Sequence, residues 1–248
     1  MEVHHHPKVE KKNFKEYFLE FLMIFLAVTM GFFAENIREG ITENTKAKEY
    51  AQSLYGDLKE DASFLNQIKA YKSLRGLKID SLISILSSEY VQKNAKLVYY
   101  YHSFMDGNIP FHSSDVTIQQ LRNSGGLRFF KNTKLYSAIA KYYEGVNFYI
   151  ERENTTYVRV PANLSSKIFQ ADILISIASM TRNPGDAISM PPGNPQLLTV
   201  DKQILNEYLL YVGNQKQSNE LSLMLLHISV ENNLNELLSV LQNEYNLH

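Results

Sequence analysis

Three cations surround a Ser-Gly-Gly turn in the middle of the chain, and this arrangement is suited to binding an anion. A glycine-rich turn directs several backbone N–H groups toward one point, and nearby guanidinium and ammonium groups add positive charge. The ligand would be a phosphate, a carboxylate or a lipid head group. The alternative is an ordinary helix end whose cations are solvated. The candidate residues are Arg122, Ser124, Gly125, Gly126, Arg128 and Lys131.

Two further clusters contain residue types that bind metals or transfer protons. The tract His4–His6 has no Asp or Cys nearby to complete a tetrahedral set, and a flexible tip is its alternative interpretation. A second group flanks one loop at a spacing that is not diagnostic of any site: His102, Asp106, His112 and Asp115. We therefore expect no bound metal, no cofactor and no catalytic residues, and predict that the chain is not an enzyme.

One carboxylate, Glu20, lies inside the apolar run Tyr17–Ala34. This run would span roughly 27 Å as a helix, close to the hydrocarbon thickness of a bilayer. Glu20 is one turn from the start of the run, where it can snorkel toward Lys15 or Lys12, or face a partner. Small residues share its helix face and allow close helix packing. The predicted contact face for a partner membrane protein or a second copy is Glu20, Ala27, Gly31 and Ala34.

The apolar run has three interpretations: a cleaved signal peptide, a buried core helix and an uncleaved membrane anchor. The only plausible cleavage point has Phe32 at its −3 position, and the run is long for a signal. We therefore predict an anchor in the inner (cytoplasmic) membrane. Four lysines precede the run, whereas the basic residues after it are more widely spaced, which favours an N-terminus inside. The predicted divisions are a cytoplasmic head (1–16), a transmembrane helix (17–34) and a periplasmic, that is extracytoplasmic, helical bundle (35–248).

The pattern after the run is helical, and period-two strand patterns are nearly absent. Residues 35–88 carry apolar residues at spacings of three and four, which predicts that the membrane helix continues as a long helix of the bundle. Asp57 and Asp61 are expected on its solvated face. Gly76 is the best candidate for a break, after which Leu77–Leu86 continues the helix or begins another. The fold predicted from these features is an all-α, antiparallel helical bundle.

Several shorter helices are predicted beyond residue 95. Residues 96–105 form an amphipathic stretch. A helix capped by Ser114 or Asp115 is predicted to end at the Ser-Gly-Gly turn, where a glycine can adopt the left-handed cap. Another begins at Asn132 or Thr133 and is kinked or broken by Pro161. Residues 162–180 are predicted to be helical, 183–195 to be a proline-rich loop, and 200–212 and 220–246 to be two final helices.

Composition excludes several functional classes. The 248 residues include 25 Lys and Arg against 26 Asp and Glu, so no basic surplus exists for contacting nucleic-acid phosphates, and we expect no nucleic-acid partner. The absence of cysteine excludes disulfides, Cys-based zinc sites and a catalytic thiol.

Two segments resemble an uncharacterised family of single-pass membrane proteins that is common in Bacteroidota. One is Tyr55–Asp61, which is similar to a Glu-Asp-Leu-rich helix of that family. The other lies within Ser114–Tyr143, where the matching positions are Thr117, Leu121, Ser124, Gly125, Leu127, Phe130, Lys131, Asn132, Leu135, Tyr142 and Tyr143. Phe130, in place of an aliphatic residue, and the His4–Pro7 head depart from the pattern. The resemblance implies a membrane-anchored helical protein and assigns no functional residue.

The function expected from these features is interaction, as a scaffold, an assembly factor or an accessory subunit in contact with the lipid bilayer and a membrane protein partner or a second copy. The alternative is an extracytoplasmic module that senses a ligand or an anion. Such a sensor would have to signal through a partner membrane protein, because the short N-terminal head leaves no room for an output domain.

Overall fold

The structure is a computed structural model, and it describes residues 13–105, 107, 109–156, 161–180 and 188–247. Within these ranges every regular element is a helix, which confirms the all-α prediction. The chain divides into two compact units, Met1–Tyr50 and Ala51–His248. Helix α1 (Phe14–Leu86) contributes to both units, so the apolar run and the first bundle helix belong to one continuous helix, as predicted.

Helix α1 passes through Gly76 without a break. A Cβ added at Gly76 would lie 3.4 Å from the Asn219 side chain, so another helix packs closely at this point. Glycine costs a helix interior about 1 kcal/mol relative to alanine. Packing on both sides of Gly76 outweighs this cost, and Leu77–Leu86 continues the helix.

In the second unit the buried residues of α1, apart from Tyr55, are separated by steps that alternate between three and four. This heptad spacing is typical of helices that pack side by side along their length. We call these positions the α1 seam, and it consists of Ala51, Leu54, Leu58, Asp61, Leu65, Ile68, Lys72, Arg75, Ile79, Leu82 and Leu86. The expectation that Asp61 is solvated is wrong, because its side chain occupies a seam position and is only 2% exposed.

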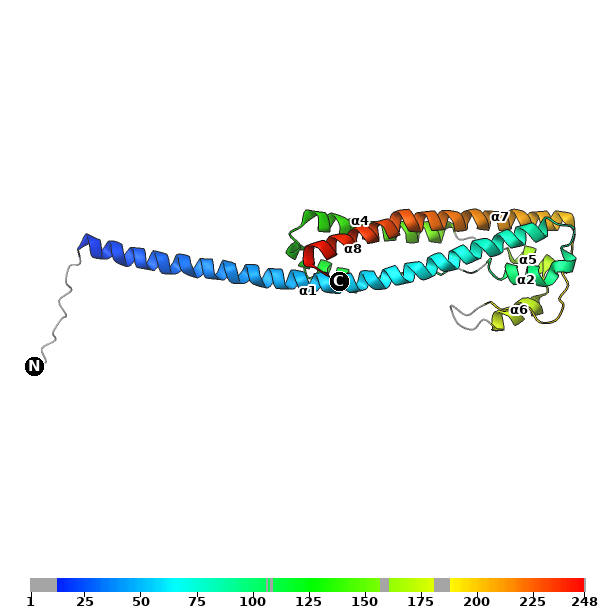
Figure 1. Ribbon diagram of the computed structural model, residues 1–248, viewed down its shortest axis with the longest axis horizontal. Helices are drawn as coiled ribbons and strands as arrows, with labels where there is room; N and C mark the ends of the chain where they lie inside the picture. The colour runs from blue at the N-terminus through cyan, green and yellow to red at the C-terminus, as the bar shows by residue number, and fades with distance from the viewer. Residues whose placement is uncertain (1–12, 106, 108, 157–160, 181–187, 248) are drawn as a thin grey trace, which may run out of the picture. The chain divides into compact units, whose positions relative to one another are not determined.

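Two further long helical segments pack along α1 (Figure 1). The first is α4 (Thr133–Thr156). The second is a continuous run of α7 (Lys202–Leu225), the π-helix η3 (Leu226–Glu231) and α8 (Asn232–Tyr245). The prediction of separate helices at 200–212 and 220–246 is therefore wrong. Gln215 and Asn219, which lie between the two predicted helices, are buried residues of α7 rather than part of a loop.

Side-chain hydrogen bonds define the directions of these helices. Along α1, Tyr55 bonds Gln242, Lys69 bonds Glu231, and Asp80 bonds Lys216, so the α7–α8 run is antiparallel to α1. Helix α4 is parallel to α1, because Asp61 bonds Tyr142 and Lys72 bonds Glu153. The second unit is thus an antiparallel helical bundle.

The π-helix accommodates one residue more than the heptad spacing of the α7–α8 run requires. Buried positions alternate by three and four from Leu205 to Leu226, then step by four to Val230 and again by four to Leu234. A π-turn holds an additional residue per turn, so the later buried residues return to the core. Helix α4 approaches this segment closely, since a Cβ at Gly145 would lie 1.9 Å from the Ser229 carbonyl oxygen.

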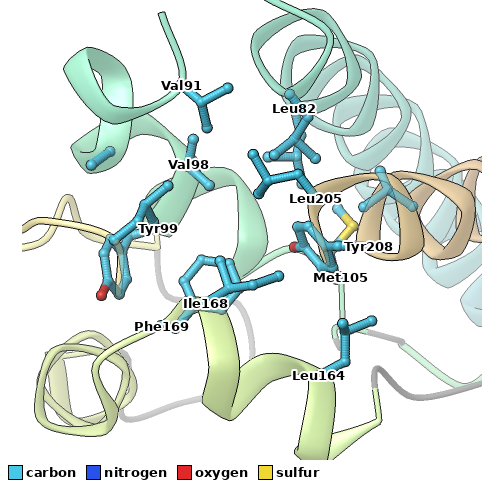
Figure 2. Packing of buried hydrophobic residues seen from close by; sticks show 14 of the residues in the cluster. Leu82, Val91, Val98, Tyr99, Met105, Leu164, Ile168, Phe169, Leu205 and Tyr208 are labelled. Carbon is cyan, nitrogen blue, oxygen red and sulfur yellow. The ribbon is translucent and has the colours of Figure 1, made fainter. Parts of the chain in front are cut away.

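Shorter helices close one end of the second unit, where they share a core with α1 and α7 (Figures 1 and 2). They are α2 (Ala95–His102), α5 (Ala162–Ile168) and α6 (Ala171–Met180), and the 3-10 turn η1 (Gln92–Asn94) precedes α2 without contributing a buried residue. The predicted single helix over 162–180 is divided at Phe169 and Gln170. Phe169 adopts extended backbone and is buried, while the Gln170 N–H donates to the Tyr99 hydroxyl at 2.6 Å. Residues 188–200, in the predicted proline-rich region, form no regular element.

Candidate functional site

The predicted anion-binding turn joins α3 (Val116–Asn123) to the 3-10 helix η2 (Gly126–Phe129). Gly125 has a φ of 67°, which confirms the left-handed cap. The N–H groups of Ser124 and Gly125 donate to the carbonyl oxygens of Gln120 and Arg122 within the turn, at 2.9 and 3.4 Å. These donors are therefore used internally.

The cations around the turn lie against aromatic rings. The Arg122 guanidinium carbon is 5.6 Å from the Tyr143 ring centroid, and that of Arg128 is 5.2 Å from the Phe129 ring centroid. Gly126 is buried, and Lys131 is exposed. The structure thus places the predicted residues around one turn, and anion binding there stays a prediction.

The described residues that were considered for a metal or acid–base site differ in their surroundings. His102 is buried, stacks on Phe169 at a centroid distance of 4.1 Å, and its Nδ1 is 2.7 Å from the Tyr208 hydroxyl oxygen. Burial lowers the pKa of His102 to about 4, so the imidazole is neutral at pH 7. His112 is exposed, while Asp106 and the tract His4–His6 lie outside the described residues. The described part of the chain contains no group of three His, Cys, Asp or Glu residues suited to a metal ion.

Two carboxylates of α1 hold the start of α3. Asp57 accepts a hydrogen bond from the Thr117 N–H at 3.0 Å, which caps the helix from outside. Asp61 accepts from the Ser114 N–H at 2.7 Å and from the Tyr142 hydroxyl at 2.5 Å. The predicted cap is corrected accordingly: Asp115 occupies the N-cap position, but its side chain makes no capping bond.

The two segments that carry the family resemblance are therefore in direct contact. Asp57 and Asp61 come from the first segment, and their partners come from the second. Burial raises the pKa of the Asp61 carboxyl above its ordinary value, although the hydrogen bonds from Tyr142 and Ser114 oppose that rise. This contact is a structural joint of the bundle.

In the first unit, most side chains of the apolar run are exposed. The large apolar side chains that are exposed between Phe18 and Phe33 retain 48–69% of their accessible surface. Of the described helices, α1 alone is long and apolar enough to cross a membrane, and none of its apolar window is buried. In the predicted contact face, Ala27, Gly31 and Ala34 are exposed and Glu20 is half-buried.

A group of polar residues, all buried except the half-buried Glu153, joins α1, α4 and α7, and we call it the polar layer. Lys72 is 2% exposed, and its ammonium donates to the Glu153 carboxylate at 2.7 Å. The Ser222 hydroxyl donates to the same carboxylate, and the Tyr149 hydroxyl is 3.2 Å from the Ser222 hydroxyl. The layer consists of Lys72, Arg75, Tyr149, Glu153, Gln215, Asn219 and Ser222.

Arg75 binds both backbone and side-chain acceptors in this layer. Its guanidinium donates to the carbonyl oxygens of Phe104 and Met105 at 2.9 and 2.8 Å, and to the Gln215 amide oxygen at 2.6 Å. It also reaches the Asn219 amide oxygen at 3.3 Å, and the Asn219 amide N–H donates to the Lys72 carbonyl oxygen at 2.9 Å. Each polar group named here therefore has a partner of matching chemistry.

The pKa shifts of Lys72 and Glu153 show how burial and pairing oppose each other in this ion pair. Burial lowers the pKa of the Lys72 ammonium below its ordinary value, and the nearby Glu153 offsets only part of that effect. For Glu153, burial alone would raise the pKa, but Lys72 and the hydrogen bonds of Ser222 and Tyr149 hold it below its ordinary value. The carboxylate gains from the pair, whereas the ammonium loses more hydration than it recovers. Such a pair adds little net stability.

The sequence contained a signal for the polar layer. Lys72 and Arg75 continue the alternating steps of three and four along α1, Glu153 continues them along α4, and Gln215 and Asn219 do so along α7. A search restricted to apolar residues passes over these positions. Extending the spacing through the polar residues as well would have identified them.

Comparisons of this chain with protein-family models, with curated proteins and with solved structures find no match. The resemblance to the Bacteroidota membrane family thus rests on the two segments alone. The fold and the contacts described above carry the functional argument.

Proposed function

We propose that this protein is a membrane-anchored interaction protein, acting as a scaffold, an assembly factor or an accessory subunit at the inner membrane. The observation that carries the proposal is the exposed apolar run within 17–34. Apolar side chains left in water are costly at roughly 25 cal/mol per Å², and a run of this length is suited to the bilayer interior. The second unit has a separate buried core, so the run is not needed to complete it.

The proposed orientation places the N-terminus in the cytoplasm and the bundle in the periplasm. Its support is the position of Lys8, Lys11, Lys12 and Lys15 just before the run. The chain lacks cysteine, so Ala178→Cys, at an exposed site in α6, provides a single thiol for labelling. A membrane-impermeant maleimide should label this variant in intact spheroplasts. Labelling only after the inner membrane is permeabilised would refute the orientation.

The partner in this proposal is another membrane protein or a second copy, bound through Glu20, Ala27, Gly31 and Ala34. A Cβ at Gly31 would meet no atom within 4 Å, so Gly31→Leu changes the helix surface without disturbing the fold. Gly40→Leu is the matched control, because Gly40 is equally open and lies beyond the run. Cross-linking and mass spectrometry of native membranes should detect a stoichiometric complex that Gly31→Leu weakens and Gly40→Leu preserves. A complex unaffected by either substitution would exclude this face.

A further inference from the structure

Apolar packing alone leaves the axial register of the bundle helices poorly defined. Apart from Tyr55, buried positions alternate by three and four along α1 from Ala51 to Leu86, and they do so along α7 from Leu205 to Leu226. On α4, the positions Leu135, Ile139, Tyr142, Val146, Tyr149 and Glu153 follow the same spacing. A helix displaced by one or two turns would therefore again set apolar side chains against apolar side chains. Another feature must select one arrangement.

We propose that the polar layer is a register lock, which fixes the axial position of α1 against α4 and α7 and contributes little to the net stability of the bundle. Its polar groups occupy consecutive buried positions on each helix, and they match only when the three helices are aligned as observed. A single polar position is known to specify register in helical assemblies at a cost in stability.

The hydrogen bonds of Arg75 fix the position of α1 along its axis. Its guanidinium contacts two backbone carbonyl groups beyond α2, those of Phe104 and Met105, as well as Gln215 on α7. Displacing α1 by one turn would move this guanidinium by about 5 Å, beyond hydrogen-bonding distance of these acceptors. The same displacement would take Lys72 away from Glu153. The Lys72 ammonium would then be buried against apolar residues of the facing helices, which is unfavourable.

The test uses the cysteine-free chain, at full length and in detergent or nanodiscs. Asp80 and Lys216 form an exposed ion pair at 2.6 Å, so Asp80→Cys with Lys216→Cys reports the observed register by cross-linking. Glu220 lies one turn further along α7, and Asp80→Cys with Glu220→Cys reports a one-turn displacement. Each cysteine pair is combined with Lys72→Met/Glu153→Met, and with Lys141→Met/Glu236→Met, which removes an exposed ion pair as the control.

In the Lys72→Met/Glu153→Met background, the displaced cross-link should rise severalfold while the thermal midpoint stays equal or increases. The control should leave the displaced cross-link at its parent level. The charge exchange Lys72→Glu/Glu153→Lys, which retains a pair, should also remain at that level. An unchanged displaced cross-link in the Met/Met variant would overturn the proposal. Failure of that variant to fold would overturn it too, because the layer would then be a stabilising element.

Discussion

The two units contain parts of the same helix, yet apolar side chains are exposed in one and charged side chains are buried in the other. In the first unit, the phenylalanines of the run Tyr17–Ala34 are exposed. In the second unit, α1 buries Asp61, Lys72 and Arg75. The difference shows that position relative to a packing partner, rather than side-chain polarity, decides burial along α1. The exposed half is long and apolar enough to cross a membrane, while the buried half sets its polar side chains against polar partners at defined positions.

The strongest test of this comparison removes one partner from the polar layer. Lys72→Met leaves the Glu153 carboxylate buried without its ammonium, and it should lower the free energy of unfolding by about 3–5 kcal/mol. Adding Glu153→Met should recover most of that loss. Urea unfolding followed by circular dichroism provides the measurement. Lys141→Met is the control, because its ion pair is about half exposed and should change the free energy by less than about 1 kcal/mol.

A matched pair of leucines compares the two halves of α1 directly. Leu58 is fully buried in the second unit, and Leu58→Ala should cost about 3 kcal/mol of unfolding free energy through lost burial and a residual cavity. Leu26 is 48% exposed in the first unit, and Leu26→Ala should leave the unfolding of the bundle unchanged within about 0.5 kcal/mol. Comparable losses in the two variants would contradict the distinction between the halves.

Acidification should weaken the second unit through His102. The pKa of this residue is about 4 in the folded protein, against an ordinary value of 6.5, because its imidazole is buried. The free energy of unfolding that the buried, neutral imidazole contributes is fully present above pH 6.5. It is lost progressively as the pH falls to about 4, and the total loss is about 3 kcal/mol. Unfolding of the parent and of His102→Gln, measured between pH 7 and pH 4.5, should show a smaller pH dependence in the variant.

The smallest expected effects concern two glycines of the bundle. Gly145→Ala would drive a methyl group into the backbone of the π-helix and should cost about 2 kcal/mol. Gly213 lies inside α7 with no atom within 4 Å of an added Cβ, so Gly213→Ala should stabilise by about 0.5–1 kcal/mol. The thermal midpoints of both variants would distinguish the effect of close packing at Gly145 from that of helix propensity at Gly213. Equal changes in the two midpoints would show that the π-helix does not restrict residue 145 to glycine.

The helical class, the continuity of α1 and the left-handed Gly125 cap were predictable because each depends on local spacing or residue type. The joining of α7 to α8 was not, because the buried polar residues between them resemble a loop when polarity alone is considered. The external cap by Asp57 depends on a contact between segments far apart in the chain, which no local pattern contains. The exposure of the apolar run agrees with its proposed role, while its partner and orientation stay predictions.

The π-helix Leu226–Glu231 also determines where the length of the chain can change. It already holds the one surplus residue of the α7–α8 run, so deleting one residue there would yield an uninterrupted α-helix with Leu234, Leu237 and Leu241 still facing the core. Deleting one residue in the middle of α7 would instead rotate part of the helix by about 100° relative to the rest and turn its buried face away. Tolerance to a one-residue deletion within the α7–α8 run is thus concentrated in its π-helical turn.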